Sequence, residues 1–187
     1  MAGSKKNAVK QARQLALIDE SGFYLVPGVV RSYAPRGDRP ELHPFLTRDH
    51  LSVISAVTPA GQLYSHTSEQ ALDGLEVALF VQHLLEQLGC PLLLLWDGSP
   101  IHHSQQVQDC LAQLGPGQVV TERLPPYAPE LNPDEGVWQY LKYVELRNQV
   151  CLNLQQLRFR LHRAIMRLRS KPALIRSFFA GAGLGLD

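Results

Sequence analysis

The sequence predicts one α/β domain in which a mixed five-stranded sheet is flanked by helices on both faces. Three observations lead to this fold class. Short β-branched and apolar runs occupy the first third of the chain. The run Leu92–Trp96 is apolar without alternation, as in a central strand covered on both faces. Segments with apolar residues at helical spacing lie between the later strands and after the last one. The length of 187 residues suits a single domain.

The first strands are expected to form an antiparallel meander. Residues 15–18 make a short strand that ends at Asp19, and residues 23–30 contain a further strand candidate. Residues 51–57 carry β-branched side chains at period two, and residues 62–66 return the chain after a Pro/Gly turn. We therefore place Asp19 at the C-terminal end of the first strand.

Helices are expected on either side of the central strand. One begins at Ser68 and ends near Leu88, where Gly89 supplies a stop signal. A second covers residues 104–114, and residues 118–124 form the last strand. The apolar face of the first helix is predicted to consist of Leu72, Leu75, Leu79, Val81, Leu84, Leu85 and Leu88. Further helices are expected at about 134–145, 153–170 and 172–180.

Basic side chains gather at the two ends of the chain, although the formal net charge is only +1. We expect a basic N-terminal arm over residues 1–14, a core over residues 15–146, and a basic helical extension packed on that core over residues 147–187. Between Arg147 and Arg176 there are eight Lys or Arg and no Asp or Glu. Charge asymmetry of this kind fits a polyanionic partner.

Cysteine spacing and hydropathy indicate the cellular compartment in which the protein is expected. The three cysteines form no C-x-x-C pair, so we expect neither a disulfide framework nor a zinc site. No apolar run approaches the ~20 residues that span a bilayer, and no apolar signal segment follows the N-terminus. A reducing cytoplasm and no membrane partner are therefore expected.

Three acids occupy positions that suit a divalent-cation site. Asp19 and Asp97 each follow an apolar strand, and Glu135 lies in the first turn of the helix after the last strand. If the first and fourth strands are neighbours, both aspartates point into one crevice. Converging carboxylates repel one another unless a cation lies between them, and oxygen ligands without Cys or paired His select Mg²⁺ or Mn²⁺. Two such ions about 4 Å apart can stabilise the attacking and leaving oxygens of phosphoryl transfer.

Each acid also has an ordinary structural explanation. Asp19 and Asp97 both precede turn-like sequences that contain glycine, and turn chemistry alone accounts for acids there. Asp134 and Glu135 both suit the N-terminal end of a helix dipole, an interaction worth about 0.3–1 kcal/mol. We assign the dipole role to Asp134 and metal binding to Glu135. The joint placement of the three acids is stronger evidence than any one of them.

Three sequence segments resemble those of a known family. The first runs from Trp96 to His103, where an Asp follows an apolar strand and histidines come a few residues later. The second is a proline–tyrosine loop leading into Asn-Pro-x-Glu-x-x-Trp-x-x-Leu-Lys, which ends at Lys142. The third is Asp-Glu-Ser-Gly-Phe at 19–23, followed by Tyr-Ala-Pro-Arg-Gly at 33–37. Over residues 15–145 the chain resembles the DDE transposases of bacterial insertion sequences and mariner-type elements. The resemblance implies a ribonuclease-H-like fold and a catalytic, metal-binding triad of Asp19, Asp97 and Glu135.

The resemblance also implies partners. DNA, as transposon ends and as target, is the expected substrate, and a dimer on DNA is expected because two ends must be brought together. Full-length relatives carry N-terminal helix-turn-helix modules, whereas this core begins near residue 15, so we expect such a module on a separate chain or domain. The interval from Asp97 to Glu135 is a few residues longer than in mariner-type relatives, and we place the excess around residues 115–117. A bacterial, nucleoid-associated location follows from the same resemblance.

Several side chains are candidates for DNA contact: His102, His103, Lys142, Arg158, Arg163 and Arg167. Histidines near a helix start often cap or pack, and Lys142 suits solvent as well as it suits a phosphate. The stripe Leu154, Leu157, Leu161, Ile165 and Leu168 predicts that one face of the 153–170 helix is core or a subunit interface. Arginines occupy the remainder and pair well with phosphate, the alternative being a solvated basic face. Trp138 is expected in the core and Tyr127 as a loop anchor.

The leading hypothesis is a transposase catalytic domain. Such a domain hydrolyses a DNA phosphodiester with Mg²⁺ or Mn²⁺, and the freed 3′-hydroxyl then attacks target DNA. A structure-selective nuclease of the ribonuclease H type would use the same acids. A third hypothesis, from a different functional class, is a non-catalytic accessory chain that binds DNA or a helix-turn-helix partner.

Overall fold

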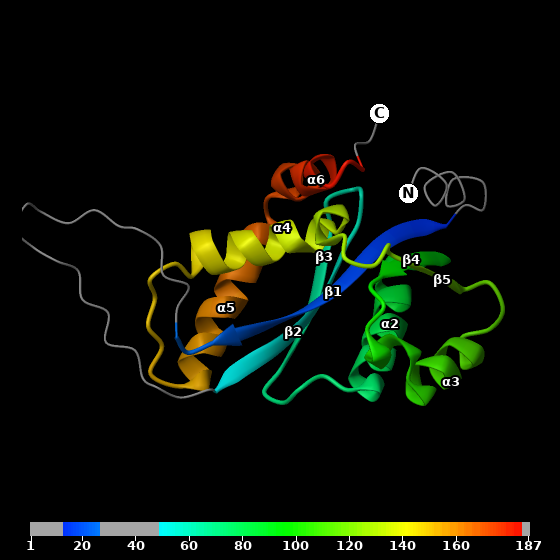
Figure 1. Cartoon of the computed structure of the whole chain (residues 1–187), viewed down its shortest axis with the longest axis horizontal. Coiled ribbons are helices and arrows are strands. Elements are labelled where there is room, and N and C mark those ends of the chain that lie inside the picture. Colours follow the sequence, from blue (N-terminus) through cyan, green and yellow to red (C-terminus); the bar gives the residue numbers. More distant parts are fainter. Residues whose placement is uncertain (1–12, 27–48, 185–187) are drawn as a thin grey trace, which may run out of the picture.

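The computed structural model describes residues 13–26 and 49–184 of the chain (Figure 1). Most of the expected N-terminal arm, the strand candidate beyond residue 26 and the segment 33–37 lie outside these ranges. The strands are β1 (Gln14–Tyr24), β2 (His50–Val57), β3 (Leu63–Ser68), β4 (Leu92–Trp96) and β5 (Val119–Arg123). The helices are α2 (Gly74–Leu88), α3 (Gln105–Gln113), α4 (Pro133–Tyr140), α5 (Leu154–Arg169) and α6 (Pro172–Gly181). A π-helical turn, Leu141–Glu145, follows α4.

The sheet has the strand order β3-β2-β1-β4-β5. β2 is antiparallel to β1 and β3, whereas β4 is parallel to both of its neighbours, β1 and β5. All five residues of β4 are buried, as the unbroken apolar run predicts for a strand covered on both faces. The predicted mixed five-stranded sheet is therefore confirmed.

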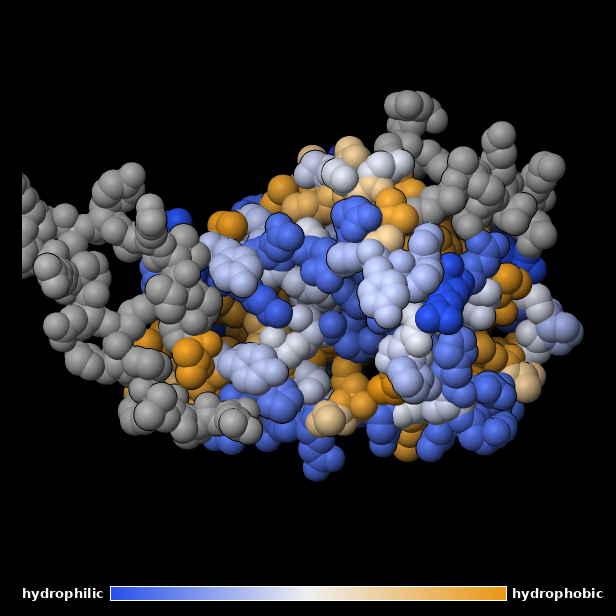
Figure 2. All heavy atoms as spheres, viewed as in Figure 1, coloured by the Kyte–Doolittle hydropathy of each residue, from blue (hydrophilic) through white to orange (hydrophobic). Residues whose placement is uncertain are grey.

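Helices cover both faces of this sheet. In Figure 1, α4, α5 and α6 lie on one side of the strands, and α2 and α3 lie on the other. One apolar cluster fills each interface between sheet and helices. The cluster on the α4 side contains Val137 and Trp138 of α4. It also contains Leu161 and Leu168 of α5 and Phe179 of α6, so the C-terminal helices share the core. On the face in Figure 2, hydrophilic side chains predominate and apolar ones form separate patches.

β1 is longer than the sequence suggests, and Asp19 lies within it rather than at its end. The strand continues through Glu20, Ser21 and Gly22 to Tyr24. Ser21 and Gly22 pair with residues of β2, so ladder hydrogen bonds to the neighbouring strand override the turn preference of this segment. The prediction that Asp19 ends the first strand was wrong.

α2 begins six residues later than predicted. Ser68 is still paired in β3, and the helix is capped by Asp73, whose carboxylate accepts hydrogen bonds from the backbone amides of Leu75 and Glu76. Two side chains of the predicted apolar face, Leu75 and Leu79, are more than half exposed. The buried face instead consists of Gly74, Val77, Ala78, Phe80, Val81 and Leu84. Gly89, at φ 63°, ends the helix as predicted.

The remaining helices lie close to their predicted positions. Across residues 13–26 and 49–184, no helix combines the length and apolar character that a membrane span requires.

Candidate active site

Strand alternation places Asp19 and Glu20 on opposite faces of the sheet. In β1, Leu17 and Phe23 belong to the apolar cluster under α4–α6, whereas Ala16 and Ile18 belong to the cluster under α2 and α3. Side chains alternate along a strand with period two. Asp19 therefore points towards α4, and Glu20 points to the other face.

The parallel register brings Asp97 level with Asp19. The last paired residues of β1 and β4 are Leu17 and Leu95, and the two aspartates each follow two positions later. Asp97 is the first residue beyond β4 and is exposed. Its Oδ1 accepts a hydrogen bond from the Ser99 backbone N–H at 2.8 Å, which fixes the carboxylate at the strand end.

The proline loop delivers Glu135 from α4. Pro133 occupies the first turn of the helix, and the Asn132 side chain caps it by accepting from the Asp134 backbone N–H at 3.2 Å. Glu135 then joins Asp19 and Asp97 in the lining of one pocket of about 500 Å³. The proline loop, residues 124–129, forms another part of the same wall. The three acids singled out from the sequence thus line one open pocket.

Asp19 sits in an environment that disfavours its charge. Burial raises the pKa of Asp19 to about 7, and the charges of Glu20 and Glu135 act in the same direction. The indole N–H of Trp138 donates to Asp19 Oδ2 at 2.8 Å and opposes this rise in part. Trp138 is buried, as predicted, and it also orients the first acid of the pocket.

Asp134 lies in the first turn of α4, where the helix-dipole role was expected, but it is a buried acid. Its side chain is fully buried between the first turn of α4 and the sheet, where Ser55 of β2 donates a hydrogen bond to its Oδ1. Among the described residues, its Oδ2 has no hydrogen-bond partner. Burial, followed by the charge of Asp19, raises the pKa of Asp134 well above its usual range. The residues around Asp134 carry no local signal for this burial, because Ser55 is distant in the chain.

His102 is buried and connects two acids. Its Nε2 lies 2.8 Å from Glu20 Oε1, and its Nδ1 lies 3.2 Å from Asp97 Oδ1. The ring stacks on Trp96 with centroids 4.6 Å apart. Although burial disfavours the charged imidazole, the hydrogen bond to Glu20 and the nearby acids raise the pKa of His102. This geometry suits positioning of Asp97, whereas the exposed side chain of neighbouring His103 is open to a ligand.

Lys142 lies close to the acids. Its Nζ donates to the Ser21 hydroxyl at 2.7 Å and lies 5.3 Å from the centre of the Phe23 ring. Burial lowers the pKa of Lys142, while the charges of Glu135 and Asp19 act against that change. Tyr127, in contrast, is fully exposed on the proline loop, so its predicted role as an anchor was wrong.

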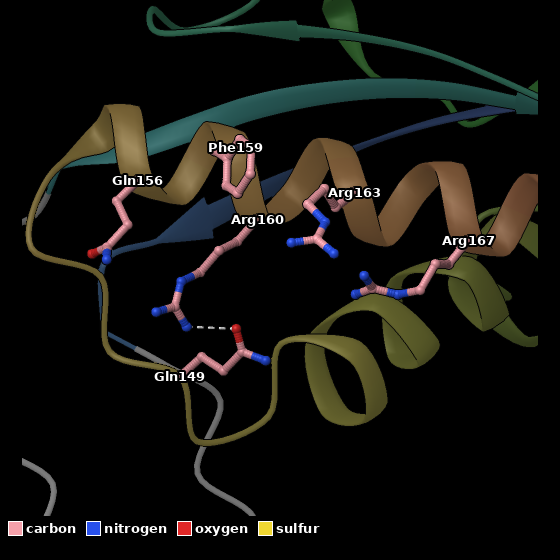
Figure 3. A pocket seen from close by; sticks show the side chains of 6 residues that line it. All are labelled: Gln149, Gln156, Phe159, Arg160, Arg163 and Arg167. Carbon is pink, nitrogen blue, oxygen red and sulfur yellow. Dashed lines mark hydrogen bonds between the residues drawn. The ribbon is translucent and has the colours of Figure 1, made fainter.

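Three arginines of α5 line a common hollow, whereas Arg158 and Arg169 lie outside it. Arg160, Arg163 and Arg167 line a hollow of about 410 Å³ with Gln149, Gln156 and the exposed ring of Phe159 (Figure 3). Arg158 instead pairs with Glu69 at 2.9 Å. Arg167 pairs with Glu145 at 2.6 Å, and Arg160 donates to Gln149 at 2.7 Å. The predicted apolar stripe of this helix is buried, apart from the partly buried Leu154.

The donors of the acid pocket suit a hard divalent cation in kind. Asp19, Asp97 and Glu135 offer only carboxylate oxygens, which Mg²⁺ and Mn²⁺ prefer. A cation among them would offset the repulsion that helps to raise the pKa of Asp19. Within the described ranges, no three His, Cys, Asp or Glu side chains are already gathered closely enough to hold a metal.

Solved structures of similar fold include those of a mariner transposase. The catalytic domain of Mos1 mariner transposase matches 100% of this chain and 93% of its own length, at 13% identity and a TM-score of 0.55. A pre-cleavage Mos1 transpososome matches 98% of this chain, at 15% identity and a TM-score of 0.64. The Mos1 paired-end complex with Mn matches 100%, at 16% identity and a TM-score of 0.59. The chain spans only 60% and 62% of the Mos1 chains in those two complexes.

These likenesses identify the fold, and the predicted ribonuclease-H-like architecture is confirmed. No curated protein matches the chain. The family itself is identified by the sequence match of residues 14–158, which contain all three acids of the pocket. The chain belongs to the family of DDE superfamily endonucleases.

Proposed function

We propose that this chain is the catalytic part of a transposase, which hydrolyses DNA phosphodiesters and then joins the freed 3′-hydroxyl to target DNA. One observation carries the proposal: Asp19, Asp97 and Glu135 come from three separate elements and line one pocket within the matched family region. Mos1, whose chains share this fold, is a transposase with paired-end complexes containing Mg and Mn.

Asp19, Asp97 and Glu135 would hold the metal, and Mg²⁺ or Mn²⁺, as two ions, would stabilise charge on the attacking and leaving oxygens. Groups of the protein itself, side chains and one backbone N–H, prepare these ligands. Trp138 orients Asp19 through its indole N–H, while Ser99 and His102 fix Asp97. The Asn132 cap sets the start of the helix that carries Glu135.

DNA is the proposed partner, and basic side chains flank the acids in a way that suits it. Lys142 lies beside Asp19 and Glu135, and the exposed His103 follows Asp97 along the chain. Arg163 and Arg167 line the hollow along α5, and none of the described residues that line it is acidic. Arg158 lies outside this lining and pairs with Glu69. A separate helix-turn-helix module and a dimer on DNA complete the proposal.

Substitution of the acids tests the function. We expect Asp97→Asn and Glu135→Gln each to abolish Mn²⁺-dependent nicking of supercoiled plasmid DNA while the thermal unfolding midpoint stays near that of the wild type. Calorimetric titration with Mn²⁺ should show binding to the wild type and weakened binding to both variants. Nicking that survives either substitution would overturn the proposal. Joined products, rather than nicks alone, separate strand transfer from a simple nuclease.

A further inference from the structure

Arg123 carries a cation into the acid pocket. It is the last residue of β5 and pairs in parallel register with Trp96, the residue before Asp97. Its side chain is exposed and lines the same pocket as the three acids. The proline loop begins directly after it, so Arg123 lies between the end of β4 and that loop.

Gly98 leaves room for this cation. A Cβ atom built at position 98 would overlap the guanidinium group of Arg123, so the planar group lies against the α-carbon of the glycine. Gly98 does not have a positive φ, and its backbone therefore suits any L-residue. The space beside Asp97, rather than an unusual backbone conformation, is what glycine provides here.

The guanidinium has no competing partner among residues 13–26 and 49–184. No hydrogen bond or ion pair there involves the Arg123 side chain, whereas the side chains of Arg158 and Arg167 each pair with a glutamate. A guanidinium presents several N–H donors in a fixed fork that matches phosphate oxygens. Its exposed donors are therefore available to a ligand that enters the pocket.

We propose that Arg123 binds a nonbridging oxygen of the DNA backbone, at or beside the phosphodiester that the acids act on. The inference rests on the proposed function and adds a substrate-binding residue to it. DNA phosphates must approach three carboxylates in this pocket, and a cation beside Asp97 offsets that repulsion. Lys142 lies near Asp19 and Glu135, so Arg123 supplies the cation on the Asp97 side.

Two substitutions remove the same contact by different routes. Arg123→Ala removes the cation, whereas Gly98→Ala keeps it and displaces it. We expect each to weaken binding of a fluorescein-labelled DNA duplex by about tenfold, as for a lost charge-assisted hydrogen bond. In Arg123→Ala, the slope of log affinity against log salt should fall by about 0.9, as for one phosphate contact. Mn²⁺-dependent plasmid nicking should fall as well.

The double variant distinguishes this contact from damage to Asp97. The three atoms nearest to a Cβ at position 98 all belong to the Arg123 guanidinium, so once Arg123 is alanine, Gly98→Ala should add no further loss. A double variant markedly weaker than Arg123→Ala would overturn the link between the two residues. Arg176→Ala, which removes an exposed arginine from α6, is the charge-matched control and should behave as the wild type.

The two proposals fail in different ways. If Arg123→Ala kept the DNA affinity, salt slope and nicking of the wild type, the proposed role of Arg123 would be overturned. The proposed catalytic role of the three acids would be unaffected. Wild-type nicking by Asp97→Asn would overturn the catalytic proposal, and the binding measurements would still decide whether Arg123 contacts DNA.

Discussion

Asp19 is held in the folded protein at the cost of stability. Its carboxyl is enclosed beneath α4, and burial raises its pKa from 3.8 to about 7. The unfolded chain ionises this group near pH 3.8, whereas the folded chain keeps the proton until about pH 7. Protonation therefore favours the folded state. This contribution is present below pH 3.8, is lost as pH rises, and is gone above pH 7.

The variant Asp19→Asn should remove this pH dependence. Asparagine keeps an oxygen to accept the Trp138 N–H but carries no charge. In buffers with a chelator, we expect the variant and the wild type to have similar stability near pH 4. The variant should be the more stable above pH 7, by a difference on the order of 4 kcal/mol. Urea unfolding across this range measures the difference.

An exposed acid provides the control for that experiment. Asp109→Asn, on the surface of α3, should follow the wild-type profile. A constant difference between Asp19→Asn and the wild type from pH 4 to pH 8 would contradict the assignment of this pH dependence to Asp19.

The sequence predicts some residues of the site and not others. Asp97 could be found because an acid directly after an unbroken apolar strand is unusual, and Glu135 because it starts a helix after a proline loop. The burial of Asp134 depends on Ser55, 79 positions away, and local sequence carries no trace of that contact. Arg123 becomes a pocket residue only through the register between β4 and β5.

At the scale of elements, α5 combines two faces with different tasks. Leu161, Ile165 and Leu168 anchor it in the core, and arginines line the hollow in Figure 3. Arg163 lies 5.6 Å from the centre of the exposed Phe159 ring, where its cation remains accessible. A phosphate backbone laid along this hollow would meet positive charge without an acidic side chain in the lining.

Arg163 and Arg158 form a matched pair for testing this surface. Arg163→Gln should weaken DNA binding and lower the salt slope by about 0.9, because one phosphate contact is lost. Arg158→Gln removes the same charge from the same helix but from a side chain already paired with Glu69. Fluorescence anisotropy over a salt series measures both. Equal losses in the two variants would show that only the net charge of the helix matters.

Element boundaries were predictable where local signals act alone. Gly89 ends α2 as expected because a left-handed glycine is a local signal. The start of α2 was not predictable from Ser68, because that residue is held by pairing with β2 and the nearby Asp73 caps better. Leu79 fits a helical stripe, yet the face that meets the sheet is centred on Val77, Val81 and Leu84.

At the scale of the whole molecule, the two tryptophans report on opposite sides of one sheet. Trp96 belongs to the cluster beneath α2 and α3, and Trp138 belongs to the cluster beneath α4–α6. All five strands lie in one continuous sheet between these clusters. The two halves of the core therefore share their central layer and should unfold together.

Single-tryptophan variants test that cooperativity. In Trp96→Phe the remaining indole reports on the α4 side, and in Trp138→Phe it reports on the α2 side. In each variant, we expect the urea midpoint from fluorescence to coincide with the midpoint from far-ultraviolet circular dichroism. Of the two variants, Trp138→Phe should lose more stability relative to the wild type, because Asp19 loses its indole donor. Separate midpoints within one variant would show that the two sides unfold independently.

The position of Asp19 inside β1 has a consequence for how the gene can change in length. A single codon inserted between those for Leu17 and Ile18 would move Asp19 to the face now held by Glu20 and would turn Ile18 into the pocket. The turn around Gly115 and Gly117 lies between α3 and β5, and the pairing of β4 with β5 continues beyond it. Insertions and deletions should therefore accumulate at that turn in natural variants, while the length of β1 stays fixed.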